Sequence, residues 1–519
     1  MVKTRLSLRL RLSALAALSL MLLALYPQFN LWLLRGSDWN GAYAYNDLDE
    51  VAYAAYLNAL INARPRRNDP YTGRDDRPNQ PQPESLFSIQ FVPPYALALV
   101  ARVTGMNASW AMIIASCIGA IGAALALFWL IVALTNDERL AATGALFVLC
   151  FGTLACAQGA VGYFFGSGPP YPYLPFLRRY VPALPFPLFC VMCALVWRAL
   201  MSDNNRARLA AAIGAGLSFA LLVFSYFYLW TSAAAWLALL VLLWLLARPD
   251  NYRRNLKTLA LTCVVSLLAL LPYAYLLSNR AKMIDNVQLL THTRAPDLFR
   301  PPLLIGIIVC IVLAIAARRR LISLRERAVL FTISLALTPL LVFNQQIITG
   351  RSLQPIHYEV FIVNYVALTA LVLATALLWR GATRESRQTS NRILFIIALA
   401  TFCWGVFEVK LTTEPVAEQN IIRDEAILVD KRLAQLAHKT RDTLDVPTVL
   451  STNFIHADSL PTTAPQAVLW ARHQHIFVGL TLEEDRERLF QLFYYVGADA
   501  NWLRQTLNEN IVIQIALFG

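Results

Sequence analysis

The stretch that decides the fold is RLAAAIGAGLSFALLVFSYFYLWTSAAAWLALLVLLWLLA, residues 208–247, which carries no charge after Arg208. As a single helix it would be about 60 Å long, about twice the thickness of the hydrocarbon core of a bilayer. We therefore predict two membrane-spanning helices here, at 208–226 and 229–247. Two consecutive apolar helices of this length are typical of a membrane protein and not of a soluble one.

The composition of the whole chain is that of a membrane protein. Of the 519 residues, 57% are apolar and 15% are charged, and the mean hydropathy is +0.50. Soluble domains have about 45–50% apolar and about 25% charged residues. These values exclude a soluble multidomain enzyme and a disordered protein. All eight cysteines lie inside apolar runs, where they behave as small hydrophobic residues, so no disulfide framework or zinc site is predicted.

We predict a polytopic α-helical membrane protein with about eleven spans. They cover residues 13–34, 109–134, 140–165, 181–201, 208–226, 229–247, 258–277, 301–317, 328–346, 359–379 and 393–410. The first span runs into Tyr26-Pro27 without a small-residue cleavage site, so we expect it to be retained rather than removed as a signal peptide. Phe87–Val103 is short and contains Pro93-Pro94, so we expect it to be interfacial or re-entrant.

The net charge of +13 indicates topology rather than nucleic-acid binding. The Lys and Arg residues form short clusters between apolar runs, and most of them fall on one side if the amino terminus is cytoplasmic, as the positive-inside rule requires. The cluster Arg318-Arg319-Arg320 lies inside only if 208–247 is split and Phe87–Val103 does not cross. We expect a bacterial inner (plasma) membrane, with membrane lipid as a partner and no nucleic acid.

Two domains are predicted. Residues 1–410 form the multispan domain, with a first outer loop at 35–108, and residues 411–519 form a small extracytoplasmic α/β domain. In this tail, the hydrophobic patterns predict helices at 420–440 and 483–495 and strands at 447–451, 475–479 and 511–517. His473 and His475 would share one face of the second strand; two histidines without a third ligand are weak evidence for a metal, so we favour surface histidines.

The first outer loop opens with an acidic motif, Asp47-Leu48-Asp49-Glu50. Apolar residues follow it at helical spacing, which predicts an amphipathic helix at the membrane surface. In one interpretation, Asn46 or Asp47 caps this helix and the acids complement its dipole. In the other, a carboxylate deprotonates an acceptor hydroxyl or holds a divalent cation. Both interpretations stay open, and they make Asp47, Asp49 and Glu50 the candidate catalytic residues.

An acidic motif that follows the first span and leads into a membrane-surface helix resembles the GT-C superfamily of polyprenyl-phosphate-dependent membrane glycosyltransferases. The resemblance extends to the multispan core and the outward tail. It implies that a first-loop acid is the base or a metal ligand, that the donor is a polyprenyl-phosphate-linked sugar, and that transfer inverts the anomeric centre. The second outer loop, 166–180, has no acid and the tail has no Trp-Trp-Asp motif, so transfer of a glycan to protein is disfavoured.

Paired arginines in the second outer loop break the positive-inside trend. Arg178 and Arg179 lie where Lys and Arg are otherwise scarce. They either reach along the bilayer surface to headgroup phosphates or clamp the phosphate of a lipid-linked donor, because the guanidinium fork binds two phosphate oxygens together.

The connector at 344–359 is unusually polar for a link between two apolar helices. Arg351 and His357 are candidate phosphate contacts, and Gln345 and Gln346 are candidate partners of sugar hydroxyls, because amides and ionisable groups in a membrane usually face a cavity or one another. The alternative is an ordinary hairpin turn in which Glu359 pairs with an arginine.

These features favour an integral membrane glycosyltransferase that acts on the non-cytoplasmic face. The alternatives are a transporter or flippase for a lipid-linked or anionic solute, and a non-catalytic membrane scaffold. Transporters tend to carry charged residues at mid-membrane, whereas the centres of the predicted spans are almost free of charge. A divalent cation is the candidate cofactor.

Overall fold

The computed structural model describes residues 2–166, 171–178, 180–281, 284–287, 290–382, 387–439, 447–477, 479–509, 513, 514 and 517. The chain divides into two compact units. Unit 1 consists of residues 1–26, 115–274 and 289–415, and unit 2 consists of residues 27–114, 275–288 and 416–519. The first outer loop and the carboxy-terminal tail therefore fold within the same unit.

Among the described residues, ten helical segments are long and apolar enough to cross a membrane. This confirms the polytopic helical fold with one segment fewer than predicted. The segments are built on α1 (Val2–Arg35), α5 (Ala108–Thr135), α10 (Pro185–Met201), α11 (Asn205–Val223), α12 (Phe227–Ala247), α13 (Tyr252–Ser278), α15 (Pro301–Arg318), α16 (Arg327–Asn344), α19 (Asn364–Ala382) and α20 (Arg387–Thr413).

The stretch 208–247 is split as predicted, because α11 ends at Val223 and α12 begins at Phe227. Residues 87–103 also fail to form a spanning helix. They contain part of α3 (Leu86–Ile89) and most of α4 (Val92–Thr104). At 13 residues, α4 is about 20 Å long, which is shorter than the hydrocarbon core.

The prediction of one continuous helix over 140–165 is wrong. The segment forms three short helices, namely α6 (Glu138–Cys150), α7 (Gly152–Ala155) and α8 (Ala160–Phe164). Ala157 and Gly159 have φ values of 54° and 63°, which a right-handed helix cannot contain. A Cβ atom on Gly159 would lie 1.9 Å from Oε1 of Glu408. That carboxylate accepts a hydrogen bond from the backbone N–H of Ala160 at 3.1 Å.

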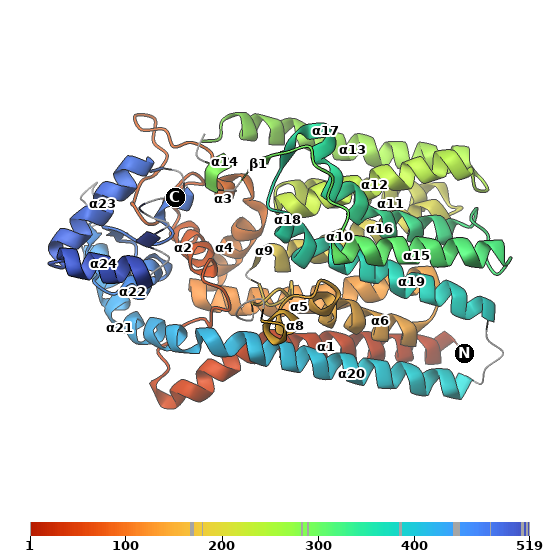
Figure 1. The fold of residues 1–519 in the computed structure, drawn as a ribbon, viewed down its shortest axis with the longest axis horizontal. Helices are drawn as coiled ribbons and strands as arrows, with labels where there is room; N and C mark the ends of the chain where they lie inside the picture. Colours follow the sequence, from red (N-terminus) through yellow and green to blue (C-terminus); the bar gives the residue numbers. More distant parts are fainter. Residues whose placement is uncertain are drawn as a thin grey trace. The chain divides into compact units, whose positions relative to one another are not determined.

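The long helices of unit 1 run roughly parallel to one another, and α16 packs against α12, α15 and α19 (Figure 1). Buried aromatic side chains join α16 to α12 and to α10. The ring of Phe331 lies 5.5 Å from that of Trp236 and 5.5 Å from that of Trp197, both edge to face, which is a favourable geometry for aromatic pairs. The result is a tightly packed apolar bundle.

Unit 2 is organised around α2 (Glu50–Ile61), which packs against α4, α22 (Phe454–Ser459) and the 3₁₀ turn η4 (Leu460–Thr462). Every residue from Glu50 to Leu60 is buried. The prediction that this helix is amphipathic is therefore wrong. Apolar and aromatic residues surround the helix, and segments from both ends of the chain cover all of its faces, as when Phe87 stacks on Phe477 at 4.5 Å beside Tyr56.

The tail is a small α/β structure, as predicted. Helix α21 (Ala417–Lys439) and helix α23 (Leu482–Tyr495) confirm the two predicted helices, and α24 (Ala500–Glu509) adds a third. Strand β3 (Thr448–Val449) lies within the predicted strand 447–451 and pairs in parallel with β4 (Ala467–Val468). The other two strand predictions are wrong. Residues Gln474–Phe477 form a 3₁₀ turn, η5, and Ile513, Gln514 and Leu517 are helical.

Candidate functional site

The acidic motif stands at the beginning of α2, and its three carboxylates have different environments. Residues Asp47 and Glu50 are 5% and 0% exposed, whereas the side chain of Asp49 is 50% exposed. Oε2 of Glu50 accepts a hydrogen bond from the backbone N–H of Asn46 at 2.9 Å. The cap residue of the helix is Asp49, and it makes no side-chain capping bond, so the prediction of a cap at Asn46 or Asp47 is wrong. Asp49 is the acid that meets solvent.

Helix α21 holds the extended segment that precedes the acids. The carboxylate of Asp424 accepts hydrogen bonds from the backbone N–H of Asn40 at 3.0 Å and of Ala42 at 3.1 Å. Asn420 bonds the backbone of Tyr45 in both directions, at 3.1 and 2.7 Å. Both side chains thus satisfy backbone groups that would otherwise be buried without partners, and they fix the position of the loop that leads into the acidic motif.

His473 connects the tail to this motif. It is 3% exposed, so the prediction of a surface histidine is wrong for this residue. Nδ1 lies 2.8 Å from Oδ2 of Asp458, and Nε2 lies 3.4 Å from Oδ1 of Asp49. Burial would lower the pKa of His473, but the two carboxylates outweigh burial and raise this pKa to about 9. A positively charged imidazole therefore lies between two carboxylates at neutral pH.

A second buried cation lies close to the same acids. Arg423, on α21, is 4% exposed, and its guanidinium carbon lies 5.1 Å from the centre of the Tyr45 ring. Nη1 donates to Oδ1 of Asn420 at 3.1 Å. Burial lowers the pKa of Arg423, while Glu50 and Asp458 are among the groups that oppose this change. Unit 2 thus contains a cluster of carboxylates with two buried cations, which we call the acid cluster: Asp47, Asp49, Glu50, Arg423, Asp458 and His473.

The remaining candidate residues belong to unit 1. Arg178 is 2% exposed. Its guanidinium carbon lies 4.6 Å from the centre of the Phe361 ring and 5.0 Å from that of Tyr171, and Nη1 donates to the Tyr171 hydroxyl. A guanidinium enclosed by two rings does not extend to lipid headgroups, which disfavours the headgroup interpretation for this residue. Arg179 lies outside the described residues.

His357 and Gln345 lie near the same aromatic side chains. The imidazole of His357 stacks on Tyr228 at 4.8 Å and meets Phe361 edge to face at 5.6 Å, so Arg178 and His357 contact one ring. Nε2 of Gln345 donates to the hydroxyl of Tyr358 at 3.3 Å, and Tyr358 packs against Tyr228 at 4.9 Å. We call this group the aromatic cluster: Tyr171, Arg178, Tyr228, Gln345, His357, Tyr358 and Phe361.

Gln346 and Arg351 do not join the aromatic cluster. The amide of Gln346 donates to the backbone oxygen of Ala295 at 3.0 Å, which is a structural contact. Arg351 is exposed on the short strand β2 (Arg351–Ser352), which pairs with β1 (Thr291–His292). The ion pair of the alternative interpretation also exists, because Glu359 pairs with Arg300.

Comparison with known proteins identifies the fold. No family model and no curated protein matches the sequence. The crystal structure of the Archaeoglobus fulgidus oligosaccharyltransferase in the apo form matches with a TM-score of 0.52 and 13% identity, over 93% of this chain and 68% of that chain. Its complex with Zn and sulfate gives 0.50 and 13%, over 88% and 62%. ArnT from Cupriavidus metallidurans, also apo, gives 0.49 and 13%, over 90% and 88%. The chain has the GT-C fold.

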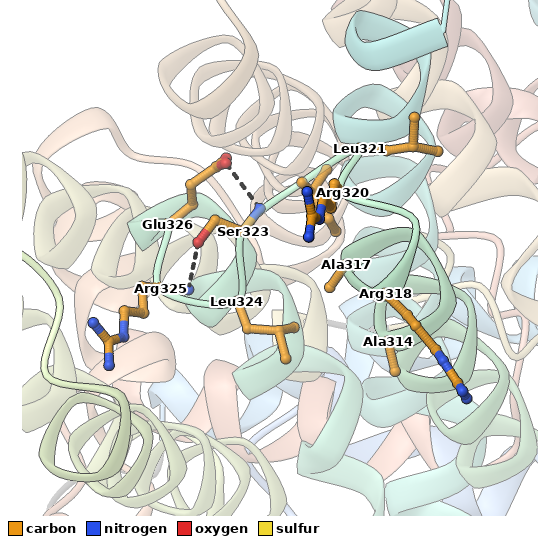
Figure 2. A pocket seen from close by; sticks show the side chains of 10 residues that line it. Ala314, Ala317, Arg318, Arg320, Leu321, Ser323, Leu324, Arg325 and Glu326 are labelled. Atoms are coloured by element: carbon orange, nitrogen blue, oxygen red, sulfur yellow. Dashed lines mark hydrogen bonds between the residues drawn. The ribbon is translucent and has the colours of Figure 1, made fainter.

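A cavity of about 770 Å³ in unit 1 is lined by residues between Ala314 and Glu326 (Figure 2). It is lined by the end of α15 and the loop to α16, including Arg318, Arg320 and Arg325. Glu326 accepts a hydrogen bond from the backbone N–H of Ser323 at 3.0 Å within this loop. None of the lining residues is among the candidates, so the cavity is not the site predicted from the sequence.

The described residues contain no group of three or more His, Cys, Asp or Glu side chains arranged to hold a metal ion. Sequence reasoning missed two residues of the acid cluster, Arg423 and Asp458, and it did not predict that His473 is buried. Asp458 lies 411 positions after Asp47, and no spacing pattern connects residues so far apart. The one available signal was the presence of ionisable residues within an otherwise apolar tail segment, 454–477.

Proposed function

We propose that this GT-C chain is an integral membrane glycosyltransferase that moves a sugar from a polyprenyl-phosphate donor to an acceptor on the non-cytoplasmic face. The observation that carries the proposal is the half-exposed carboxylate of Asp49, backed by the buried pair His473 and Asp458. A carboxylate that only begins a solvated helix needs no buried ion pair behind it. Buried charges are costly unless they are paired, so a buried ionic pair behind one exposed carboxylate favours a chemical role for that carboxylate.

The reaction that suits this arrangement is a single displacement at the anomeric carbon. The acceptor hydroxyl attacks that carbon as the bond to the donor phosphate oxygen breaks, and the electron pair of the broken bond leaves with the phosphate. The proton of the hydroxyl passes to the carboxylate of Asp49. A positioned base typically contributes about 10²–10⁴-fold to such a step. Attack opposite the leaving group inverts the anomeric centre.

From the residues of unit 1 alone, we propose that the aromatic cluster binds the phosphate of a lipid-linked donor. Arg178 presents a planar donor fork that suits two phosphate oxygens, and the hydroxyl of Tyr171, which the fork now contacts, is the group that a phosphate oxygen would replace. His357 contacts the same Phe361 ring as Arg178, and Gln345 donates to Tyr358 in the same cluster, so both are further donors. We further propose that Arg179 and Arg351 contact the lipid-linked donor. The bond from Gln346 to the backbone oxygen of Ala295 gives Gln346 a role in holding its loop.

The accompanying topology is also proposed. The amino terminus is cytoplasmic, the first outer loop 35–108 and the residues 411–519 are extracytoplasmic, and the membrane is the inner membrane of a bacterium. The distribution of Lys and Arg supports this orientation. This orientation would bring the acid cluster, which belongs entirely to unit 2, to the non-cytoplasmic face of the membrane. A flipped lipid-linked donor carries its sugar on that face.

Two experiments test the function. Mass spectrometry of lipid-linked sugars and envelope glycans, from cells with and without the protein, should show an accumulated donor and a missing glycan decoration. Purified protein in nanodiscs should transfer sugar from a synthetic short-chain polyprenyl-phosphate donor. Movement of the donor across a vesicle bilayer without transfer would overturn the proposal in favour of a flippase, and unchanged glycans would overturn it in favour of a scaffold.

A further inference from the structure

Three ionisable side chains from separate segments form a continuous line in unit 2. Asp49 comes from the start of α2, Asp458 from α22 and His473 from the turn before η5. The imidazole lies between the carboxylates, with Nδ1 at 2.8 and 3.0 Å from the two oxygens of Asp458 and Nε2 at 3.4 Å from Oδ1 of Asp49. The line runs from the interior of the unit to the one half-exposed acid of the motif.

The geometry favours one protonation state of this histidine. A neutral imidazole has one N–H group and one lone pair, so it can donate to only one of two acceptors. Both ring nitrogens of His473 face carboxylate oxygens, and only the imidazolium can donate to both. The neighbouring charges agree with this state, because the trio would carry one net negative charge and Arg423 supplies a positive one close to Asp458.

The other two acids of the motif, Asp47 and Glu50, are buried. Glu50 is wholly buried and accepts the backbone N–H of Asn46, and the backbone oxygen of Asp47 accepts the N–H of Glu50 at 3.2 Å. These bonds close the turn that starts α2. Neither acid has the exposure of Asp49, whose carboxylate can meet a substrate hydroxyl.

We propose that His473, held as an imidazolium by Asp458, is a positioning residue that orients Asp49 and keeps it ionised, so that Asp49 alone is the base of the motif. The assignment rests on the proposed glycosyl transfer. It makes the tail part of the catalytic apparatus, because the residue that prepares the base lies 424 positions further along the chain. During transfer the hydroxyl proton passes to the carboxylate of Asp49, and His473 retains both of its protons.

The test replaces His473 by Gln and uses His475→Gln as the matched control. His475 lies two positions further on, in η5, and is partly exposed. Burial and the charge of His473 lower the pKa of His475, although Asp485 and Asp49 oppose this change, so His475 places no positive charge beside Asp49 at neutral pH. A nearby opposite charge lowers the pKa of a carboxylate by about 1–3 units. His473→Gln should therefore move the acid limb of kcat/KM upward by at least about one pH unit and lower kcat about tenfold or more at pH 6, with KM for the short-chain donor within twofold. His475→Gln should leave the limb in place.

A double-variant cycle makes the link to Asp49 specific. In the Asp49→Asn background, His473→Gln should cause no further loss of turnover, since interacting residues give non-additive effects. An unmoved acid limb in His473→Gln, or a full additional loss in the double variant, would overturn the proposal. If His473→Gln does not accumulate as folded protein, Asp458→Asn carries the same test, because it removes the anion that holds the imidazolium, and an unmoved limb there also overturns it. Wild-type protein that transfers no sugar would overturn the proposed function instead.

Discussion

The stability of unit 2 should fall as pH rises from 6 to 10, and His473 should account for a separable part of that fall. The pKa of this side chain is raised from 6.5 to about 9 in the folded protein. Folding then binds a proton more tightly, so the stabilisation is complete below pH 6.5 and is lost as pH rises through 9. Each pKa unit corresponds to about 1.4 kcal/mol, which gives a loss of about 3 kcal/mol across this window.

Urea unfolding of the protein in detergent micelles, followed by the fluorescence of its tryptophans, which include the buried Trp470 of unit 2, measures this loss. The unfolding free energy of the wild type should decrease by about 3 kcal/mol more between pH 6 and pH 10 than that of His473→Gln. Taking the difference between the two proteins cancels groups that titrate in both, such as Tyr and Lys side chains. Parallel pH profiles would show that the imidazole does not bind a second proton in the folded state, and the geometric assignment of the imidazolium would fail.

Further predictions concern single positions. Asp49→Asn should lower kcat by about 10²–10⁴-fold while leaving the amount of folded protein unchanged, and wild-type turnover in this variant would return Asp49 to a solvated helix start. Arg178→Lys should raise KM for the donor or lower kcat, because a lysine ammonium lacks the bidentate fork; unchanged kinetics would remove this residue from the site. Gly159→Ala should abolish monodisperse protein on size-exclusion chromatography, since its Cβ would overlap Glu408 and its φ is +63°, whereas an intact elution profile would show that the turn can relax. Reporter fusions after residues 250, 320 and 385 should read cytoplasmic and one after 415 extracytoplasmic, and an inside reading at 415 would reverse the placement of the tail.

The membrane fold was predictable because bilayer thickness constrains helix length. That constraint separates α11 from α12 at residues 224–226, and it excludes α4 as a span. Hydropathy does not report backbone conformation, so the positive φ values of Ala157 and Gly159 and the resulting breaks between α6 and α8 could not be predicted. Nor does an apolar stripe reveal how many faces of a helix are covered. The remaining faces of α2 are buried by Phe477 and other residues that lie far away in the sequence.

The candidate site was predictable only in its local part. Asp47, Asp49 and Glu50 lie within four consecutive positions, so they are close to one another in any fold. Which of them meets solvent depends on the bond from the backbone of Asn46 to Glu50 and on the contact with His473. The second of these is a long-range contact, and one sequence contains no spacing signal for it.

The free-energy cost of burying the charges of the acid cluster bears on the role of that cluster. Buried ion pairs are poor stabilisers, since the desolvation of two charges consumes most or all of their attraction, and apolar replacements of similar shape are often neutral or better. Unit 2 has the apolar side chains to fill such a space, as the stack of Phe87 on Phe477 shows. It instead buries Arg423, Asp458 and His473 next to the acidic motif. Stability alone does not explain this arrangement. A functional role explains it directly, because an exposed carboxylate beside a substrate must stay ionised and correctly oriented.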